Sequence, residues 1–172
     1  SSLNPFPENS SESFLLSTDK DLFISWTEQV LDSNFLYVTK LEGGSWSNKK
    51  LITKGTDWFV NWADFPSISY NNLSNSIFSF HLQKSSEETF SYDVNYHINS
   101  KETWKDMNKI HDDNTFSEHG FVSSIPYKDG FMVSWLDGRN TYGVGDHGHA
   151  KGAMTIRSAV LDSNGNIVNQ YV

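Results

Sequence analysis

Short apolar runs, rather than long amphipathic stretches, make up the pattern of this chain. The runs are rich in Phe, Ile, Val, Tyr and Trp, and clusters of Asn, Ser, Gly and Asp separate them. No long stretch has apolar residues at the three-and-four spacing of an amphipathic helix. Short runs bounded by turn-forming residues are typical of β-strands. The pattern therefore predicts an all-β protein.

One of these runs occurs three times. The segments 22–26, 76–80 and 131–135 share an apolar-rich pattern that ends in a large aromatic residue. These aromatic residues are spaced 54 and 55 positions apart and are Trp26, Phe80 and Trp135. A fixed period of this size indicates a repeat architecture.

Each repeat contains four apolar runs. We predict strands at 14–16, 22–27, 35–40 and 49–53 in the first unit, at 67–70, 77–82, 92–98 and 103–110 in the second, and at 122–126, 131–136, 154–161 and 167–172 in the third. The second run of each unit has apolar residues on both alternating faces, which indicates a sheet that is covered on both sides.

Four antiparallel strands per unit, repeated around an axis, describe a β-propeller. We therefore predict four-stranded antiparallel blades at roughly 12–54, 65–113 and 120–172, preceded by a linker or N-terminal tail over 1–11. The alternative is an ordinary β-sandwich in which the likeness between the strands arose by chance.

The turn between the third and fourth strands of each unit resembles the Asp-box of sialidases, Ser-x-Asp-x-Gly-x-Thr-Trp. Each copy keeps part of the motif: Thr39-x-Leu41-x-Gly43-x-Ser45-Trp46, His97-x-Asn99-x-Lys101-x-Thr103-Trp104 and Val160-x-Asp162-x-Asn164-x-Asn166-Ile167. In such a turn a short polar side chain caps backbone N–H groups and the final aromatic residue packs between sheets. The chain thus resembles the sialidase-like (Asp-box, or BNR repeat) β-propeller superfamily over residues 12–172.

The resemblance extends to uncharacterised bacterial sialidase-family proteins through the segments 62–67 and 135–139. Sialidases have six blades, as the resemblance implies, and three blades do not close a ring. We expect the remaining blades either in residues absent from this sequence, which would make it the N-terminal half of a longer protein, or in a second chain.

Composition removes several classes of partner. The formal net charge is −8 at pH 7, the chain has no Cys, and its two arginines are Arg139 and Arg157. Without a basic stripe, nucleic acid and anionic membrane surfaces are poor partners. No apolar run reaches the length of about 18 residues that a membrane span needs. We expect an exported protein (periplasmic, secreted or lipid-anchored), although these residues contain no signal peptide.

Up-and-down strand order places three unusual loops at the end opposite the Asp-box-like turns. They are 55–65, between the first and second units, 112–120, between the second and third, and 137–152, within the third. Long loops on a rigid scaffold commonly carry function. We therefore expect the site at this end.

The first loop contains two carboxylates and two tryptophans. Asp64 is the candidate acid or base, by analogy with the Asp near the start of the sialidase propeller, and Asp57, Trp58 and Trp62 are candidate sugar-binding residues. Alternatively, Asp64 caps the turn before Pro66 and the tryptophans fill a gap between blades.

In the third unit, Asp137 and Arg139 are candidate catalytic residues, because an arginine holds a substrate carboxylate through two parallel hydrogen bonds. The alternative is a structural pair between Arg139 and Asp137 or Asp64. Arg157, within a strand, is a candidate substrate-binding residue that faces either the axis or a neighbouring blade.

The densest group of metal-binding residue types is Asp146, His147 and His149, because imidazole and carboxylate suit zinc, copper or nickel. A solvated Gly-rich loop is the alternative. Glu118 and His119 are candidate substrate-binding residues on the same face, and either one would complete a metal site if the loops converge. Apart from such a divalent metal, we expect no cofactor.

Three functions stay open. Sialidase chemistry, as the resemblance implies, needs three arginines, a Tyr nucleophile with a Glu partner, and an Asp acid/base. Two arginines do not supply the triad, and the usual early Arg-Ile-Pro signature is absent, so glycoside hydrolysis is expected only from a longer chain. The other two are an exported module that binds a glycan, a small molecule or a protein, and a metal-assisted site on the loop face.

Overall fold

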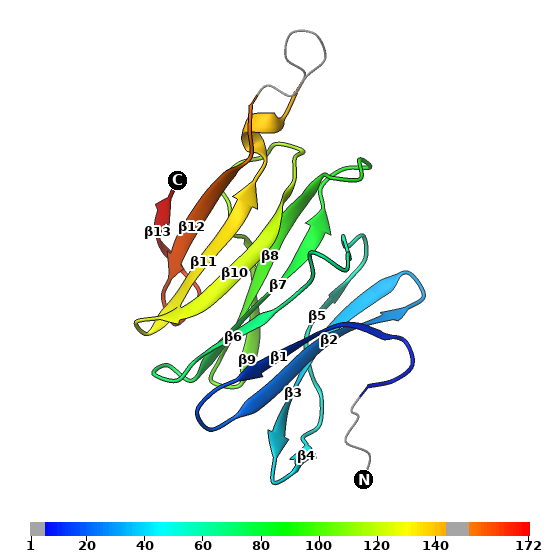
Figure 1. Ribbon diagram of the computed structural model, residues 1–172, viewed down its shortest axis with the longest axis vertical. Coiled ribbons are helices and arrows are strands. Elements are labelled where there is room, and N and C mark those ends of the chain that lie inside the picture. Colours follow the sequence, from blue (N-terminus) through cyan, green and yellow to red (C-terminus); the bar gives the residue numbers. More distant parts are fainter. Residues whose placement is uncertain (1–5, 144–151) are drawn as a thin grey trace.

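The computed structural model describes residues 6–143 and 152–172. These residues form three antiparallel sheets that follow one another across the molecule in chain order (Figure 1). The first sheet contains β1 (Ser10–Ser17), β2 (Leu22–Val30), β3 (Ser33–Glu42), β4 (Ser45–Trp46) and β5 (Lys50–Gly55). The second contains β6 (Ile68–Asn71), β7 (Ser76–Lys84), β8 (Tyr92–Ser100) and β9 (Thr103–Lys109). The third contains β10 (His119–Tyr127), β11 (Gly130–Asp137), β12 (Thr155–Leu161) and β13 (Ile167–Tyr171).

Each sheet is an up-and-down meander, as the sequence predicts. Neighbouring strands in the chain are neighbours in the sheet, and both short strands β4 and β5 pair with β3 to form one interrupted outer edge. The first strand begins earlier than expected, because Ser10 pairs with Glu28, so β1 includes the last two residues of the predicted linker. The described residues contain one short 3₁₀ helix, η1 (Arg139–Thr141), and no helix among them is long and apolar enough to cross a membrane.

The repeated aromatic residues are buried, and two of them, Phe80 and Trp135, belong to the apolar cluster of the second and third sheets. Trp26, Phe80 and Trp135 are at most 2% exposed, in the second strand of each sheet. These strands are buried on both faces over much of their length, as their alternation predicts. One apolar cluster lies between the first and second sheets and another between the second and third. Burial between successive sheets therefore holds the units together.

The first strands of the sheets lie next to one another. Strand β6 contacts both β1 and β10. Ser69 Oγ donates a hydrogen bond to Ser124 O (2.8 Å), and Asn71 Nδ2 donates to Gly130 O (2.6 Å). Side-chain hydrogen bonds to buried backbone oxygens require one relative position of the two sheets.

The third Asp-box-like turn has the capping function expected of it. Asp162 Oδ1 accepts the N–H groups of Asn164 and Asn166, both at 2.9 Å. Gly165 adopts a left-handed φ of 87°, and its carbonyl accepts a hydrogen bond from the buried Tyr96 hydroxyl (2.8 Å). The turn therefore also attaches the third sheet to the second.

Candidate functional site

The first two unusual loops and the described start of the third, residues 137–143, lie at one end of the molecule, as the topology predicts. The loop between the first and second sheets lies along the end of β7, where Phe59 N–H donates to Leu82 O (2.8 Å). The loop between the second and third sheets bonds to the end of β11, where Gly138 N–H donates to Glu118 O (2.8 Å). In Figure 1 this end carries η1 and the C-terminal ends of strands β7 and β11.

Trp62 stands at the tip of a tight turn. Asp64 N–H donates to Asn61 O (3.2 Å), and Ala63 N–H donates to the Asn61 side chain (2.8 Å). Trp62 is 85% exposed. A large aromatic ring in water, held on a hydrogen-bonded turn, is a surface on which a ligand ring can stack.

Asp64 lies beside this tryptophan but is buried. Its Oδ2 accepts the Phe121 N–H (3.0 Å), which joins the loop to β10. Burial raises the pKa of Asp64 to about 6, although the Phe121 hydrogen bond opposes the shift. Gly120 is required here, because a side chain at that position would collide with the Asp64 carboxylate and the Tyr92 ring. The carboxyl group therefore titrates near neutral pH.

A groove of about 290 Å³ opens beside Asp64, between β1, β10 and the loop that precedes β6. Its lining is mostly aromatic and small: Phe14, Ala63, Asp64, Phe65, Ser67, Phe121 and Val122. We name these residues the Asp64 groove. Trp62 does not line the groove, but the groove begins at the next two residues of its turn, Ala63 and Asp64.

The other two predicted residues of this loop lie elsewhere. Trp58 is 7% exposed, and its ring stacks on His81 with centroids 4.4 Å apart, so it fills space between sheets. This is the packing alternative for the tryptophans, and it applies to Trp58 and not to Trp62. Asp57 is exposed with a left-handed φ of 59°, and its carbonyl accepts the Lys84 N–H (2.9 Å) at the end of β7.

A tyrosine that the sequence analysis did not identify lies against Asp64. Tyr92 donates its hydroxyl hydrogen to Glu118 Oε1 (2.7 Å), and burial together with that carboxylate raises its pKa. Tyr92 is 1% exposed, and the Phe59 ring stacks on it at 4.1 Å. The phenol is therefore protonated and covered, so its oxygen does not face a substrate. Glu118, a predicted substrate-binding residue, holds this tyrosine.

A cluster of Asp and His side chains lies beneath the loops. The rings of His111 and His119 stack in parallel, with centroids 3.8 Å apart and planes 3° apart, and both side chains are fully buried. Asp93, Asp113 and Asp137 place carboxylate oxygens within 4 Å of these imidazoles. Two overlapping groups have metal-binding geometry: Asp93, His111 and His119, and Asp113, His119 and Asp137. We name the five residues the buried Asp/His cluster.

Of this cluster, the sequence analysis identified only His119 and Asp137. His111 and Asp113 follow β9, and Asp93 lies in β8, where alternation suggested an ordinary strand residue. The signal that was available is the segment His111-Asp112-Asp113, a dense group of ligand types at the start of a functional loop.

The Arg139 guanidinium donates hydrogen bonds to two carboxylates of its own chain, Asp137 and Asp112. Its Nε and Nη2 donate to the two oxygens of Asp137 (2.8 and 2.9 Å), and Nη1 donates to Asp112 (2.7 Å). These bonds raise the pKa of Arg139 further above its normal value and lower the pKa of Asp137 despite its burial. The structural pair considered for Arg139 is thus present. Arg157 lies nearby, with Nε 3.7 Å from Asp137 Oδ2.

A second histidine pair lies between the first and second sheets. His81 Nδ1 and His97 Nε2 are 2.8 Å apart, and His97 Nδ1 lies 2.6 Å from the exposed Asp106 carboxylate. Burial lowers the pKa of His81 to about 3 and also lowers that of His97. Both imidazoles are therefore neutral at pH 7.

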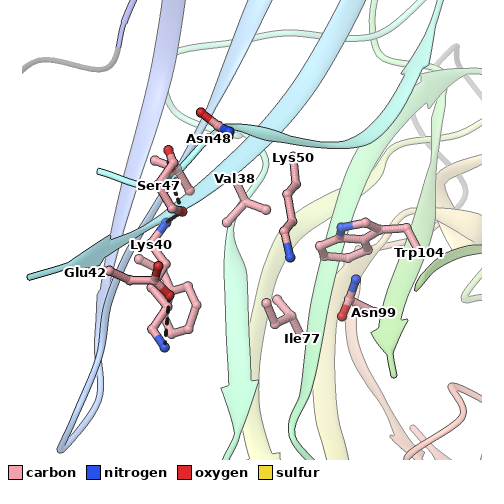
Figure 2. A pocket seen from close by; sticks show the side chains of 11 residues that line it. Val38, Lys40, Glu42, Ser47, Asn48, Lys50, Ile77, Asn99 and Trp104 are labelled. Atoms are coloured by element: carbon pink, nitrogen blue, oxygen red, sulfur yellow. Dashed lines mark hydrogen bonds and ion pairs between the residues drawn. The ribbon is translucent and has the colours of Figure 1, made fainter. Parts of the chain in front are cut away.

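Another pocket, of about 350 Å³, lies at the opposite end, beside the Asp-box-like turns. Figure 2 shows Trp104, Asn99 and Ile77 of the second sheet facing Val38, Lys40 and Glu42 of the first. Lys40 is paired with Asp21 (2.9 Å) and Glu42 (3.8 Å). The pocket is therefore the gap at the ends of two sheets, away from the loops.

The candidate metal residues Asp146, His147 and His149 lie outside the described residues 6–143 and 152–172. Comparison with known proteins adds no family: no family model matches the chain, and no curated protein matches it.

Proposed function

We propose that the three sheets are consecutive blades of a sialidase-like β-propeller, and that the loop end binds a carbohydrate. Three consecutive four-stranded meanders with adjacent first strands support the propeller, since blades of this kind surround a common axis. The Asp162 turn supports the sialidase resemblance. The remaining blades come from further residues or from a second chain, and the protein is exported.

The observation that carries the proposal is the exposed Trp62 ring next to the Asp64 groove. Sugars present apolar C–H faces and a rim of hydroxyl groups. An aromatic ring stacks on such a face, and a carboxyl group accepts hydrogen bonds from hydroxyls. Trp62 and Asp64 supply these two functions within three positions of one rigid turn.

Binding suits these residues better than hydrolysis. Tyr92 is the one tyrosine that bonds to a glutamate among the described contacts, and it is buried, with the Phe59 ring stacked on its own ring. Arg139 already holds Asp137 and Asp112, so its guanidinium has no free edge for a substrate carboxylate. Of the three predicted catalytic residues, Asp64 is the one that has a property needed for acid–base catalysis, namely a pKa of about 6.

A glycan array probed with the whole chain tests the proposal. We expect Trp62→Ala to weaken binding at least tenfold, because the stacking surface is lost, while the melting temperature stays within about 1 °C because the ring is exposed. Leu73→Ala is the matched control: Leu73 is 82% exposed in the β6–β7 turn, at the other end of the strands, and binding should not change. Absence of glycan binding by the unmodified chain, or full binding by Trp62→Ala, would reject the proposal.

A further inference from the structure

Two imidazole nitrogens in the buried Asp/His cluster have no hydrogen-bond partner. They are the Nε2 atoms of His111 and His119, and both side chains are fully buried. A buried polar atom without a partner destabilises the folded state, so such atoms are rare in native proteins unless something else satisfies them. The proton position on the His119 ring shows what that ring needs.

The tautomer of His119 follows from its neighbours. Its Nδ1 lies 3.2 Å from Tyr92 O and 3.1 Å from Ser117 O. Carbonyl oxygens only accept, so Nδ1 carries a hydrogen. In the neutral ring Nε2 then has a lone pair, yet it faces Asp113 Oδ1 (3.0 Å) and Asp137 Oδ1 (3.7 Å). Three electron-pair donors therefore face one another and require a positive charge between them.

The geometry also shows which atom of His119 is free to bind an ion. The Nδ1–H is held by two backbone oxygens, whereas Nε2 has no hydrogen-bond partner and faces two carboxylate oxygens. The Nε2 lone pair is therefore directed at the position that a metal ion would occupy.

The surroundings orient each of the three electron-pair donors. Backbone oxygens accept the Nδ1–H of His119. His111 Nδ1–H donates to Asp113 Oδ1 (2.7 Å), and Trp135 Nε1–H donates to Asp137 Oδ2 (2.9 Å). Partners that hold the far side of a histidine or carboxylate are typical of metal ligands in proteins.

The distances from His119 Nε2 to the two carboxylates also suit one ion. Two ligands at about 2.0–2.2 Å from a Zn²⁺ lie about 3.0–3.6 Å from each other, depending on the angle. The distances from His119 Nε2 to Asp113 Oδ1 and Asp137 Oδ1, 3.0 and 3.7 Å, need a change of only a few tenths of an ångström at most. The ion would complete its coordination with water.

We propose that His119 Nε2, Asp113 and Asp137 bind a divalent transition-metal ion, of which Zn²⁺ and Mn²⁺ fit one imidazole and two carboxylates. The other group, Asp93, His111 and His119, is the poorer site, because the His119 nitrogen near Asp93 is Nδ1 (3.7 Å), which already donates to two carbonyls. The proposed ion links the end of β11 to the loop after β9 and to the start of β10.

Arg139 sets the affinity. Its Nε donates to Asp137 Oδ1 (2.8 Å), and its Nη2 lies 3.5 Å from Asp113 Oδ1. Asp137 Oδ1 also accepts the Arg139 backbone N–H (3.2 Å), so both its lone pairs are engaged and the ion would displace this longer hydrogen bond. The guanidinium also repels the ion, and we expect a dissociation constant of order micromolar rather than nanomolar.

Calorimetric titration of the chelator-treated whole chain with ZnCl₂ tests the site. We expect one ion per chain and a melting temperature that rises with zinc concentration, as binding to the folded state requires. His119→Gln and Asp113→Asn should each weaken the binding at least tenfold. His97→Gln, which changes one imidazole of the other pair, and His147→Ala/His149→Ala should leave the affinity unchanged.

A measurement on the unmodified chain tests the site even if a variant does not fold. Nitrogen-15 NMR distinguishes an imidazole Nε2 that carries a lone pair, a proton or a metal ion, and zinc should shift the His119 Nε2 signal. Zinc binding that His119→Gln retains, or a His119 ring that is doubly protonated at pH 7 and does not respond to zinc, would overturn the proposal.

Discussion

The two buried histidine pairs resemble each other in stacking and differ in what surrounds them. His81 and His97 have ring centroids 5.0 Å apart, and His111 and His119 have centroids 3.8 Å apart, with planes nearly parallel in both pairs. In the first pair the histidines bond to each other. In the second pair both Nε2 atoms are unpaired.

The first pair is satisfied without any added charge. His97 Nδ1–H donates to Asp106, which leaves His97 Nε2 as an acceptor for His81 Nδ1–H. Two neutral rings and one exposed carboxylate thus form a chain in which every donor faces an acceptor. Around His119, by contrast, acceptors face an acceptor. Burial of a histidine alone does not indicate a metal site. What indicates it is whether the ring nitrogens face hydrogen-bond donors or only other acceptors.

The largest expected effect is the difference in lost stability between two substitutions, one of Asp137, beside His119, and one of Asp106, beside His97. Asp137→Ala should destabilise the fold by about 3–5 kcal/mol, because it leaves Arg139 and the Trp135 indole without a buried partner. Asp106→Ala should cost less than about 1 kcal/mol, since that carboxylate is 70% exposed. Urea denaturation measures both. Equal losses for the two variants would contradict the contrast.

The next effect is acid destabilisation through the first pair. The pKa of His81 is about 3 in the folded chain and 6.5 when exposed, so the unfolded state binds more protons between these values. The contribution of neutral His81 to the free energy of unfolding is therefore complete above pH 6.5. It falls by up to about 1.4 kcal/mol per pH unit as the pH decreases toward 3. We expect His81→Gln to flatten the dependence of unfolding free energy on pH in this range. A curve as steep as that of the unmodified chain would show that His81 does not titrate this way.

The smallest effect comes from Asp64, which acts in the opposite direction. Its pKa is raised from 3.8 to about 6, so the folded state binds more protons in that interval and gains stability as the pH falls through it. Asp64→Asn keeps an oxygen for the Phe121 N–H. We expect this variant to be more stable than the unmodified chain at pH 7, by about 1 kcal/mol, and to lose stability more steeply between pH 6 and 4. Parallel pH curves for the two proteins would contradict the raised pKa.

Part of the site was predictable because it depends on strand order. Alternation and the repeat of Trp26, Phe80 and Trp135 indicated the meanders, and strand order then assigned each loop to an end of the sheets. Trp62, Asp64, Glu118 and His119 were found in this way. His119 was a candidate metal ligand, but the sequence predicted partners for it in the 137–152 loop. In the structure its neighbours are Asp113 and Asp137.

The tryptophans show why the rest was not predictable. Trp58 and Trp62 are four positions apart in one loop, and either could have been the exposed ring. Trp58 is buried because the loop lies along β7, where the His81 ring covers it. Trp62 is exposed because the Asn61–Asp64 turn directs it away from the sheets. Contacts with other sheets, absent from any local pattern, decided between them.

From its amino-acid order alone, this protein's all-β class, its three repeated units and the end that carries its unusual loops could be derived, because alternation, period and turn chemistry are local properties. The tertiary structure decided which side chains meet. Asp93, His111, Asp113, His119 and Asp137 come from four separate strands and loops, and they form one cluster only because the second and third sheets pack together. Proton positions, burial and unpaired nitrogens arise from that packing, so the chemistry of the cluster belongs to the fold.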